Sequence, residues 1–389
     1  MAKVSVILPS LNVGKYIGQC LESVVNQTLK DIEIICVDAG STDGSLETIN
    51  EYVGRDSRVK LIISDKKSYG YQMNLGISAA TGTYIGIVET DDFVSENMYE
   101  DLYKAAVENQ AEIVKADFYG FYTSGDVYKR VYRHLDPTGA YYNRVLCPAK
   151  QSQVFRFTMN TWSGIYLRSF IVDNGIEHNE TPGASYQDNG FWVQSFCCAQ
   201  KVLFVDKPYY MYRRDNANFS VKNLGKVYCM TEEWNYIYRW LKGDESRFQT
   251  FIGIYTLLKY RSFIFTYNRI SPELREDYVM HMSSELGKHI AAREYKKNQF
   301  MPYEQRNLNL IVNAPKEYHR MRTHNCSYIT TCDLCDRFSR HTSLVRVIKF
   351  ADKAVYKAEL ALSYLSYYGV IRGLRAVKNM MKQDSRKVL

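Results

Sequence analysis

The chain has 389 residues, a length typical of two domains, with 14% aromatic and 24% charged residues. This composition excludes an intrinsically disordered chain, which would be poorer in apolar residues and richer in charge. The formal net charge of +8 favours an anionic ligand or surface only weakly, and we expect no nucleic-acid partner.

The cysteines and the first residues indicate a compartment. Nine cysteines, an odd number, occur in the chain, and several fall in apolar runs that predict buried free thiols. Free thiols are typical of a reducing cytoplasm. The apolar run at 4–8 is too short for a secretion signal, and no run approaches the roughly 18 apolar residues of a membrane-spanning helix. We therefore expect a cytoplasmic protein, with any membrane contact peripheral.

The first 117 residues alternate short β-branched runs with amphipathic helical patterns. Strands are predicted at 4–8, 32–38, 59–64, 84–88 and 113–117, and helices at 14–26, 44–52, 71–80 and 97–109. This alternation predicts an α/β fold, with a Rossmann-like, mostly parallel sheet that carries helices on both faces. A hairpin or an insertion is expected at 120–146, and an α+β region at 155–212.

Long helical patterns follow after about residue 221, with interruptions expected near 271–272 and over 302–315. We predict a first domain over 1–222 and a helical C-terminal domain over 223–389. From residue 340 onward, eleven Lys or Arg residues oppose three Asp or Glu residues on an apolar helical pattern. Such basic amphipathic helices can lie on an anionic membrane or pack on the same chain or a partner, and a homo-oligomer is one such arrangement.

Two polar segments follow predicted strands. The turn at 9–14 lacks the G-x-G-x-x-G pattern of dinucleotide-binding folds, and no Walker phosphate loop occurs. Asp38 ends the second strand and precedes a small turn-forming segment, for which a capped turn without a ligand is the alternative. Because polar side chains at the carboxyl ends of such strands usually bind ligands, these segments are candidates for one site.

Three carboxylates, Glu89, Asp91 and Asp92, follow the strand predicted at 84–88. Carboxylates this close repel one another unless a cation or hydrogen-bond donors offset their charge. A Mg²⁺ or Mn²⁺ ion with hard oxygen ligands is the simplest explanation. An acidic loop that caps the next helix is the alternative.

Four segments, in this order and spacing, resemble glycosyltransferase family 2 of the bacterial surface-polysaccharide type, which has the GT-A fold. They are VSVILP at 4–9, DAGSTDG at 38–44, NLG at 74–76 and TDD at 90–92. The resemblance covers about residues 3–220. It implies that 1–222 is a catalytic domain that binds a nucleotide sugar, with a Mn²⁺ or Mg²⁺ ion bridging the donor diphosphate. An inverting transfer is implied, from UDP-hexose or UDP-N-acetylhexosamine to a glycan or lipid-linked glycan.

The resemblance also implies roles for individual residues. Asp188 matches the family's general base, which takes the proton of the acceptor hydroxyl, and a helix N-cap is a compatible alternative. Acceptor contacts are implied at Trp162 and Gln187, with a core position as the alternative for Trp162. The metal ligands would be Glu89, Asp91 and Asp92. The implied nucleotide-binding residues are Pro9, Ser10, Asn12, Asp38, Gly40, Asn74, Asp91, Arg214 and Ser220.

Departures from the family leave alternatives open. Three positions that face the nucleotide in the family carry other residues here, namely Leu11, Ala39 and Met73. The identity of the nucleobase in the donor therefore stays open. A sugar-phosphate nucleotidyltransferase and a non-catalytic, membrane-associated assembly scaffold are the rival functions. In the C-terminal third, four zinc-type ligands occur within a dozen residues, although a single C-x-x-C is weak support for zinc. These ligands are His324, Cys326, Cys332 and Cys335.

Overall fold

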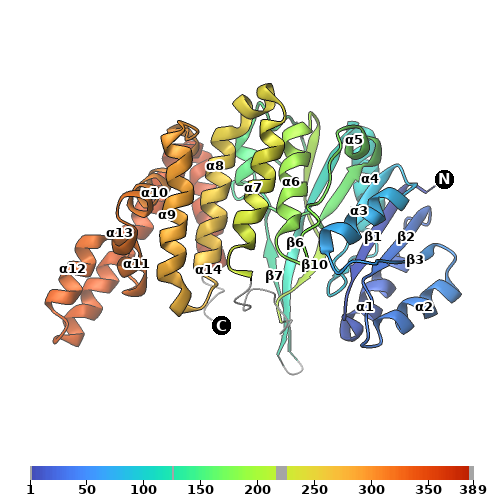
Figure 1. Cartoon of the computed structure of the whole chain (residues 1–389), viewed down its shortest axis with the longest axis horizontal. Helices are drawn as coiled ribbons and strands as arrows, with labels where there is room; N and C mark the ends of the chain where they lie inside the picture. The colour runs from blue at the N-terminus through green and yellow to red at the C-terminus, as the bar shows by residue number, and fades with distance from the viewer. Residues whose placement is uncertain (1, 125–126, 216–225, 385–389) are drawn as a thin grey trace. The chain divides into compact units, whose positions relative to one another are not determined.

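The computed structural model describes residues 2–124, 127–215 and 226–384 (Figure 1). The chain divides into two compact units, which are treated separately below. The first unit comprises 1–220 and 231–240, and the second comprises 221–230 and 241–389. The assignment of catalysis to residues 1–222 stays a proposal.

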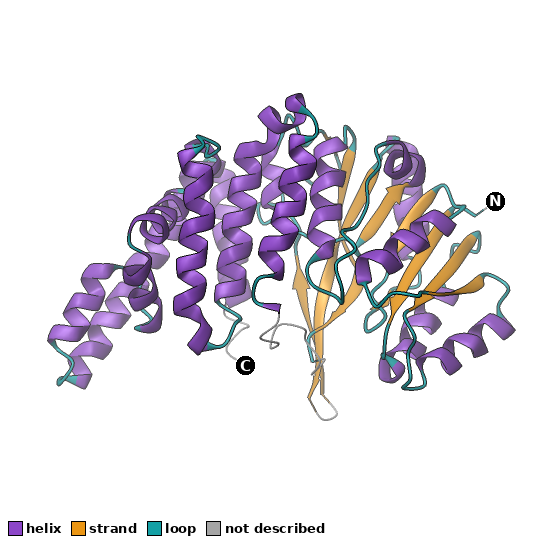
Figure 2. Cartoon of the chain, in the orientation of Figure 1, coloured by secondary structure: helices purple, strands orange, loops and turns teal. Residues whose placement is uncertain are grey.

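A ten-stranded mixed sheet lies in the first unit (Figure 2). Its order is β3-β2-β1-β4-β9-β6-β10-β5, with β7 on β6 and β8 on β10. The strands are β1 Val4–Ser10, β2 Ile32–Asp38, β3 Val59–Ile63, β4 Tyr84–Ile87, β5 Phe93–Val94, β6 Ile113–Ser124, β7 Val127–Arg133, β8 Val145–Leu146, β9 Gly164–Leu167 and β10 Val202–Arg213.

The first four strands in this order are parallel, as the sequence predicts. β1 pairs in parallel with both β2 and β4, and β2 pairs in parallel with β3. β9 then runs antiparallel between β4 and β6, while β6 and β10 are parallel. The α/β fold is therefore confirmed, and the segment at 120–146 contributes a hairpin because β6 continues into β7.

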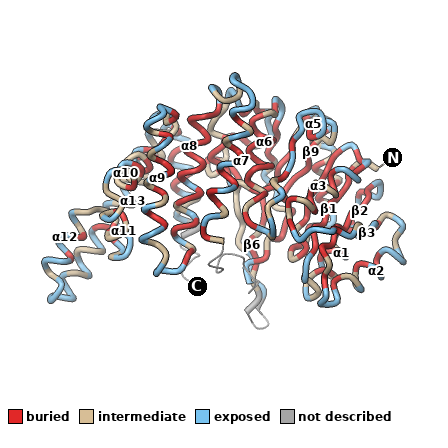
Figure 3. The backbone as a smooth tube through the Cα atoms, viewed as in Figure 1, coloured by how far each residue is buried: buried red, intermediate tan, exposed pale blue. Residues whose placement is uncertain are grey.

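Helices cover this sheet. They are α1 Gly14–Val25, α2 Ser45–Arg55, α3 Tyr69–Ala79, α4 Met98–Asn109, α5 Arg168–Asp173 and α6 Gln187–Cys198, with a 3-10 turn at Ser152–Arg156. β1 and β2 are buried along their whole length (Figure 3), which explains their continuous apolar sequences. α3 packs closely on β1, because a Cβ added at Gly76 would lie 2.5 Å from a methyl of Ile7.

The second unit is helical. Its helices are α8 Glu245–Tyr267, α9 Arg275–Ala291, α10 Pro302–Asn313, α11 Pro315–Thr323, α12 Ile329–Arg337, α13 Thr342–Tyr368 and α14 Val370–Asp384, with 3-10 turns at Pro272–Leu274 and Lys297–Gln299. α7, Cys229–Lys242, contributes to both units. Within the described ranges, no helix combines the length and apolar character needed to cross a bilayer.

One predicted boundary in this unit is wrong. The interruption expected over 302–315 is helix α10, and the two prolines that suggested a break begin α10 and α11. Proline is well tolerated at the first helical position, because the N–H that it lacks has no partner within the helix there. The interruption near 271–272 is confirmed.

Candidate active site

The loops that follow β1 and β2 are tied together by hydrogen bonds. The backbone N–H of Asn12 donates to Ser41 Oγ at 2.8 Å, and Asn12 Oδ1 accepts from the backbone N of Thr42 at 2.9 Å. Asn12 has a φ of 53° and Gly40 a φ of 82°, so both lie in the left-handed region that glycine and asparagine adopt most readily. Two of the predicted nucleotide-binding residues therefore shape these loops.

Asp38 orders the second loop from inside. Its Oδ1 accepts the backbone N–H groups of Gly40 at 2.9 Å and Ser41 at 2.7 Å, and its Oδ2 accepts the Ser41 hydroxyl at 2.6 Å. The residue is fully buried. The side chain predicted to contact the nucleotide is thus used to hold the loop that would surround one.

Gln72 of α3 joins the ends of β1 and β2, and the sequence analysis did not single it out. Its Nε2 donates to the carbonyl oxygens of Ser10 at 2.8 Å and Val37 at 2.7 Å. The sequence signal that could have identified Gln72 is a polar residue among the buried positions of helix α3. Ser10 Oγ is buried and has no hydrogen-bond partner among the described residues, and its predicted nucleotide contact stays a prediction. Pro9 accepts the Thr90 hydroxyl through its carbonyl at 2.7 Å, linking this end of β1 to the acidic segment.

Asp92 points into the protein. Its Oδ2 accepts the Tyr210 hydroxyl at 2.8 Å, and its Oδ1 accepts the backbone N–H of Arg213 at 2.6 Å. Burial raises the pKa of Asp92 well above its usual value. Because both oxygens already accept hydrogen bonds from β10, Asp92 has a structural role, and its predicted role as a metal ligand stays a prediction.

Arg213, and not its predicted neighbour Arg214, holds the acidic segment. Its Nε donates to the carbonyl oxygen of Asp91 at 2.7 Å, and its guanidinium lies 4.5 Å from the ring centres of Tyr16 and Phe121. Arg214 is exposed. Arg213 therefore positions the segment, while the side chain of Arg214 keeps its predicted role as a proposal. The predicted Ser220 lies outside the described residues.

Glu89 is held by a second residue that the sequence analysis missed. The hydroxyl of Tyr69, at the start of α3, donates to Glu89 Oε1 at 2.7 Å. Burial raises the pKa of Glu89 to about 8, since the opposing effect of the Tyr69 hydrogen bond is smaller. The charges of Asp91 and Asp188 raise this pKa further. Asp91 and Asp188 therefore both lie close enough to Glu89 to raise its pKa.

The metal prediction can be tested against these contacts. In the part of the chain that the structure describes, no group of three or more His, Cys, Asp and Glu side chains is arranged to hold an ion. Glu89 and Asp91 are half-buried and supply hard carboxylate oxygens, which suit Mg²⁺ or Mn²⁺. Two carboxylates fit an ion whose other ligands come from a bound diphosphate and water, but they form no complete site alone.

Asp188 lies in the first turn of α6. The residue that precedes α6, Tyr186, has a φ of 71°, an uncommon conformation for a residue other than glycine. Burial raises the pKa of Asp188 to about 6, although backbone N–H groups of Asn189 and Asp188 oppose the shift. Burial also raises the pKa of Tyr69, and the charges of Glu89 and Asp188 raise it further. Tyr69 is therefore close to both acidic groups.

Asn74 and Gln187, two residues predicted to contact ligands, form hydrogen bonds that hold the loop before α6. Asn74 Oδ1 accepts the backbone N–H of His178 at 2.9 Å, and its Nδ2 donates to the His178 carbonyl at 3.0 Å. Gln187 Nε2 donates to the carbonyl oxygens of Thr181 at 3.1 Å and Gly183 at 3.0 Å. Both amides therefore hold this loop, and the ligand contacts predicted for Asn74 and Gln187 stay predictions.

Glu233 of α7 fastens the same region and belongs to the first unit. Its Oε1 accepts the backbone N–H of Gly190 in α6 at 2.9 Å, and its Oε2 accepts Asn179 Nδ2 at 2.9 Å. Glu233 is buried, and burial raises its pKa to about 8. A Cβ at position 190 would lie 2.3 Å from Glu233 Oε1, so this close approach requires glycine.

Trp162 is packed in the first unit. Its ring stacks on Tyr210 at 4.3 Å and on Tyr212 at 5.1 Å between centroids, and meets Phe118 edge-on at 4.9 Å. Only 9% of the residue is exposed. The core alternative accounts for this packing, and Trp162 supports the strand whose Tyr210 holds Asp92.

The structure shows the positions of the three residues that depart from the family pattern and of the cluster formed by His324 and its neighbouring cysteines. Met73 and Ala39 are buried, whereas Leu11 is 36% exposed, so Leu11 alone of the three presents its side chain to the surface. In the second unit, the ring of His324 binds the Arg320 carbonyl at 2.9 Å and Asp336 at 3.0 Å. Both nitrogens of His324 are thus engaged elsewhere, and among the described side chains this cluster forms no zinc site.

Comparisons with known proteins agree with this architecture. The family model for glycosyl transferase family 2 matches residues 5–172. Glycosyltransferase GlyG of Streptococcus pneumoniae is 33% identical over 219 residues, which cover 54% of this chain and 70% of GlyG. The uncharacterized glycosyltransferase EpsJ of Bacillus subtilis is 34% identical over 218 residues, which cover 54% of this chain and 61% of EpsJ.

A solved structure matches more of the chain. Residues 1–349 of S. aureus TarS, crystallised in complex with UDP-GlcNAc, align with a TM-score of 0.64 at 18% identity. The alignment covers 83% of this chain and 92% of that one, and shows a shared fold. Asp188 lies beyond the residues that the family model matches, so its role as general base stays a proposal. From the family-model match and the extent of its identity with GlyG, this chain belongs to glycosyl transferase family 2.

Proposed function

We propose that the protein transfers a sugar, with inversion, from a UDP-sugar to a hydroxyl of a glycan or lipid-linked glycan acceptor. The donor would lie at the ends of β1, β2 and β4, against the loops tied by Asn12 and Asp38. Asp188 would act as the general base. The observation that carries this proposal is the position of Tyr69. Its hydroxyl holds Glu89, and its backbone N–H donates at 3.0 Å to Gly183 in the loop before α6, the helix that carries the half-buried Asp188.

The pKa of Asp188 suits this role. A general base works best when its pKa lies near the operating pH, and burial raises that of Asp188 to about 6. At neutral pH most of the carboxylate is ionised and can accept the proton of the acceptor hydroxyl as its oxygen attacks the anomeric carbon. The carboxylate sits on α6, which Glu233 and the loop fixed by Asn74 hold in place. Precise positioning of this kind lowers the barrier to reaction.

Glu89 and Asp91 would hold a Mn²⁺ or Mg²⁺ ion. When bound, such an ion stabilises the negative charge that develops on the leaving diphosphate. The chain's own contribution is to orient the two carboxylates: Tyr69 holds Glu89, and Arg213 holds the backbone of Asp91. Arg214 is the candidate for a further contact with phosphate oxygens, because a guanidinium matches their geometry.

UDP is proposed as the nucleotide because the structural relative from S. aureus was crystallised with UDP-GlcNAc. We place the reaction in the cytoplasm, because all nine cysteines are free thiols and would oxidise less readily in a reducing compartment. Family membership favours glycosyl transfer over the nucleotidyltransferase and the scaffold that the sequence left open.

The test begins with a panel of nucleotide sugars, screened for metal-dependent hydrolysis to identify the donor. Asp188→Asn should then lower transfer to the acceptor by about 1,000-fold, within the range reported for loss of a general base. UDP binding measured by titration calorimetry with Mn²⁺ should change by less than about twofold. The matched control is Asp173→Asn, which changes an exposed carboxylate at the end of α5.

Three results would overturn parts of the proposal. Normal turnover by Asp188→Asn would exclude Asp188 as the base. Release of pyrophosphate from a nucleoside triphosphate would support the nucleotidyltransferase instead. An absence of UDP binding in the presence of Mn²⁺ would favour the scaffold. The configuration of the product at the anomeric carbon, determined by NMR, decides between inversion and retention.

A further inference from the structure

Helix α13 exposes a stripe of large apolar side chains. Leu344, Val347, Phe350, Val355 and Leu362 are 41%, 63%, 76%, 57% and 65% exposed. At 100° per residue these positions fall within less than half of the helix circumference. Isolated exposed apolar residues are ordinary, but a continuous stripe of them marks a surface that binds something.

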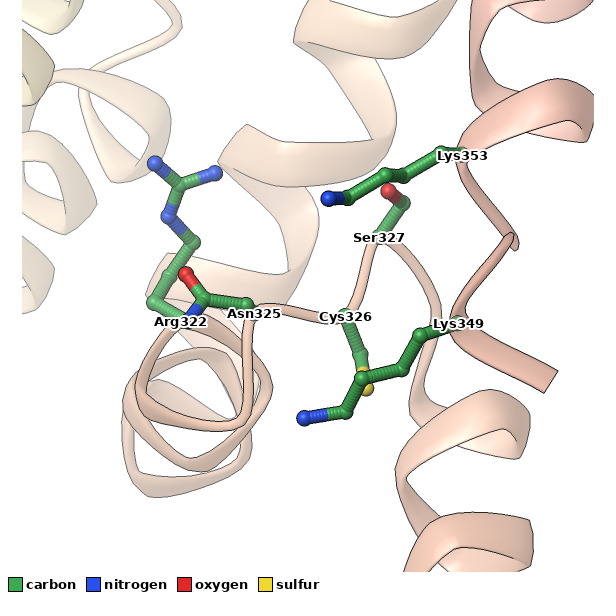
Figure 4. Close-up of a pocket in the computed structure, with 6 residues that line it drawn as sticks. All are labelled: Arg322, Asn325, Cys326, Ser327, Lys349 and Lys353. Atoms are coloured by element: carbon green, nitrogen blue, oxygen red, sulfur yellow. The ribbon is translucent and has the colours of Figure 1, made fainter. Parts of the chain in front are cut away.

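A basic pocket lies on the flank of α13, because at 100° per residue Lys349 and Lys353 fall outside the arc of the stripe, on the side of Phe350. It has a volume of about 460 Å³ and is lined by Arg322, Asn325, Cys326, Ser327, Lys349 and Lys353 (Figure 4). Lys349 and Lys353 are one helical turn apart on α13, and both extend toward the segment at 325–327. The same helix therefore carries the apolar stripe and two of the three cationic groups of the pocket.

The three cations are not neutralised by the groups around them. Among the described residues, neither Lys349 nor Lys353 forms an ion pair, and Arg322 donates to the neutral side-chain oxygen of Asn268 at 2.8 Å. Asp352, the carboxylate between the two lysines, is buried and accepts the backbone N–H of Ser327 at 2.9 Å. It fixes the segment at 325–327 on α13. The pocket therefore presents unpaired positive charge, which suits a phosphate group.

Helix α14 has the same character. Val370, Ile371, Leu374 and Met381 are 67%, 80%, 56% and 52% exposed, and basic residues lie between them in the sequence. α14 packs tightly on α13, since a Cβ added at Gly373 would lie 2.6 Å from the Cα of Leu365. Two adjacent helices thus combine exposed apolar side chains with basic ones.

We propose that α13 and α14 dock on an anionic phospholipid surface, with a headgroup phosphate in the pocket formed by Arg322, Lys349 and Lys353. Apolar side chains that enter the interface while neighbouring lysines remain at headgroup level are the hallmarks of a surface-bound amphipathic helix. A second copy of the chain is a poorer occupant, because a symmetric contact would bring the same positively charged patch of both copies together. A free phosphate would leave the apolar stripe uncovered.

The experiment uses the full chain and sedimentation with vesicles. Binding should be at least tenfold stronger to vesicles that contain phosphatidylglycerol than to pure phosphatidylcholine, and should weaken in high salt. The double variant Lys349→Glu/Lys353→Glu should weaken binding by at least tenfold, since each basic residue near an anionic surface adds attraction. Phe350→Ser should weaken it severalfold. Lys129→Glu/Lys316→Glu, which makes the same charge change at exposed lysines elsewhere, should retain binding.

Each other outcome contradicts the proposal. Failure to bind anionic vesicles, or equal binding to neutral ones, excludes the lipid surface. Full release by millimolar inorganic phosphate would assign the pocket to a soluble anion. Self-association that the α13 variants abolish, without vesicle binding, would assign the face to a second copy. Circular dichroism and donor hydrolysis of each variant show whether it is folded. The proposal does not depend on the acceptor or the base proposed above, so the two can fail separately.

Discussion

The strand ends of the first unit and the face formed by α13 and α14 are both rich in charged side chains, but they use charge in opposite ways. At the strand ends, Asp38 and Asp92 have both carboxylate oxygens bonded within the protein. On α13, Lys349 and Lys353 extend into a pocket without an ion pair among the described residues. The first region is organised before any ligand arrives, whereas the second presents charge that a ligand must neutralise.

This difference predicts how each region responds to substitution. Removing a side chain that is bonded within the protein leaves buried donors unpaired, so stability and activity should fall together. Removing a side chain that contacts only a ligand should change binding and leave the fold intact. The following predictions are ordered from the largest expected effect to the smallest, and each separates these two classes of residue.

Substitutions of the adjacent residues Asp91 and Asp92 should give the largest contrast between the two classes of residue. Asp92→Ala leaves the Tyr210 hydroxyl and the Arg213 N–H without their acceptor, and should reduce the free energy of unfolding by about 2–3 kcal/mol. Asp91→Asn, which keeps the shape of a half-buried side chain, should lower metal-dependent transfer by about 100-fold and should destabilise the fold less than Asp92→Ala does. Urea denaturation and steady-state kinetics measure both effects. Equal destabilisation by the two substitutions would remove the distinction.

Glu233 should act as a positioning residue for the proposed base, Asp188. Glu233→Ala leaves Gly190 N–H and the Asn179 amide unpaired, and should cost about 1–3 kcal/mol of stability. Because α6 carries Asp188, transfer should fall by about tenfold in kcat, with little change in the affinity for UDP. Glu232→Ala, at an exposed position on the same helix, is the matched control. A loss of stability without any change in kcat would make Glu233 purely structural.

Some of this site could be predicted from the sequence, because its signals are local. The apolar runs placed β1, β2 and β4, and the polar residues that follow them identified the strand ends as the site. Asp91 and Glu89 were found because carboxylates beside each other in sequence are also close in space. Asp188 was found through its resemblance to a family motif, since nothing in its own neighbourhood distinguishes a base from a helix cap.

The residues that were missed are distant in sequence from what they hold. Tyr210 reaches Asp92 across 118 positions, and Arg213 contacts the backbone of Asp91 across 122. No spacing rule connects such pairs, because their contact depends on β10 lying in the same sheet. For the same reason Gln187 and Asn74 were assigned to ligands. Their amides match binding motifs, but the protein's own backbone accepts and donates their hydrogen bonds.

The pH dependence of transfer should report Asp188. With its pKa raised to about 6, the carboxylate is mostly ionised at pH 7 and mostly protonated at pH 5, so kcat/KM should fall by about tenfold over this range. The same shift lowers stability as pH rises, because the folded state penalises the ionised form above the pKa of the unfolded chain. Asp188→Asn should therefore be more stable than the parent at pH 7 by about 1–2 kcal/mol. An unchanged profile between pH 5 and 7 would contradict ionisation of Asp188 as the limiting step.

The smallest effect is expected on the exposed face of α13, where the fold should be indifferent to substitutions that change binding. Phe350 is 76% exposed, so Phe350→Ser removes little buried area and should change the free energy of unfolding by less than about 0.5 kcal/mol. Phe263→Ser in the buried part of α8 is the contrasting variant and should cost several kcal/mol, about 3–5 for loss of a buried aromatic side chain. Thermal unfolding of both variants measures the difference. Strong destabilisation by Phe350→Ser would mean that this face is covered within the protein itself, which would leave no apolar stripe for a lipid surface.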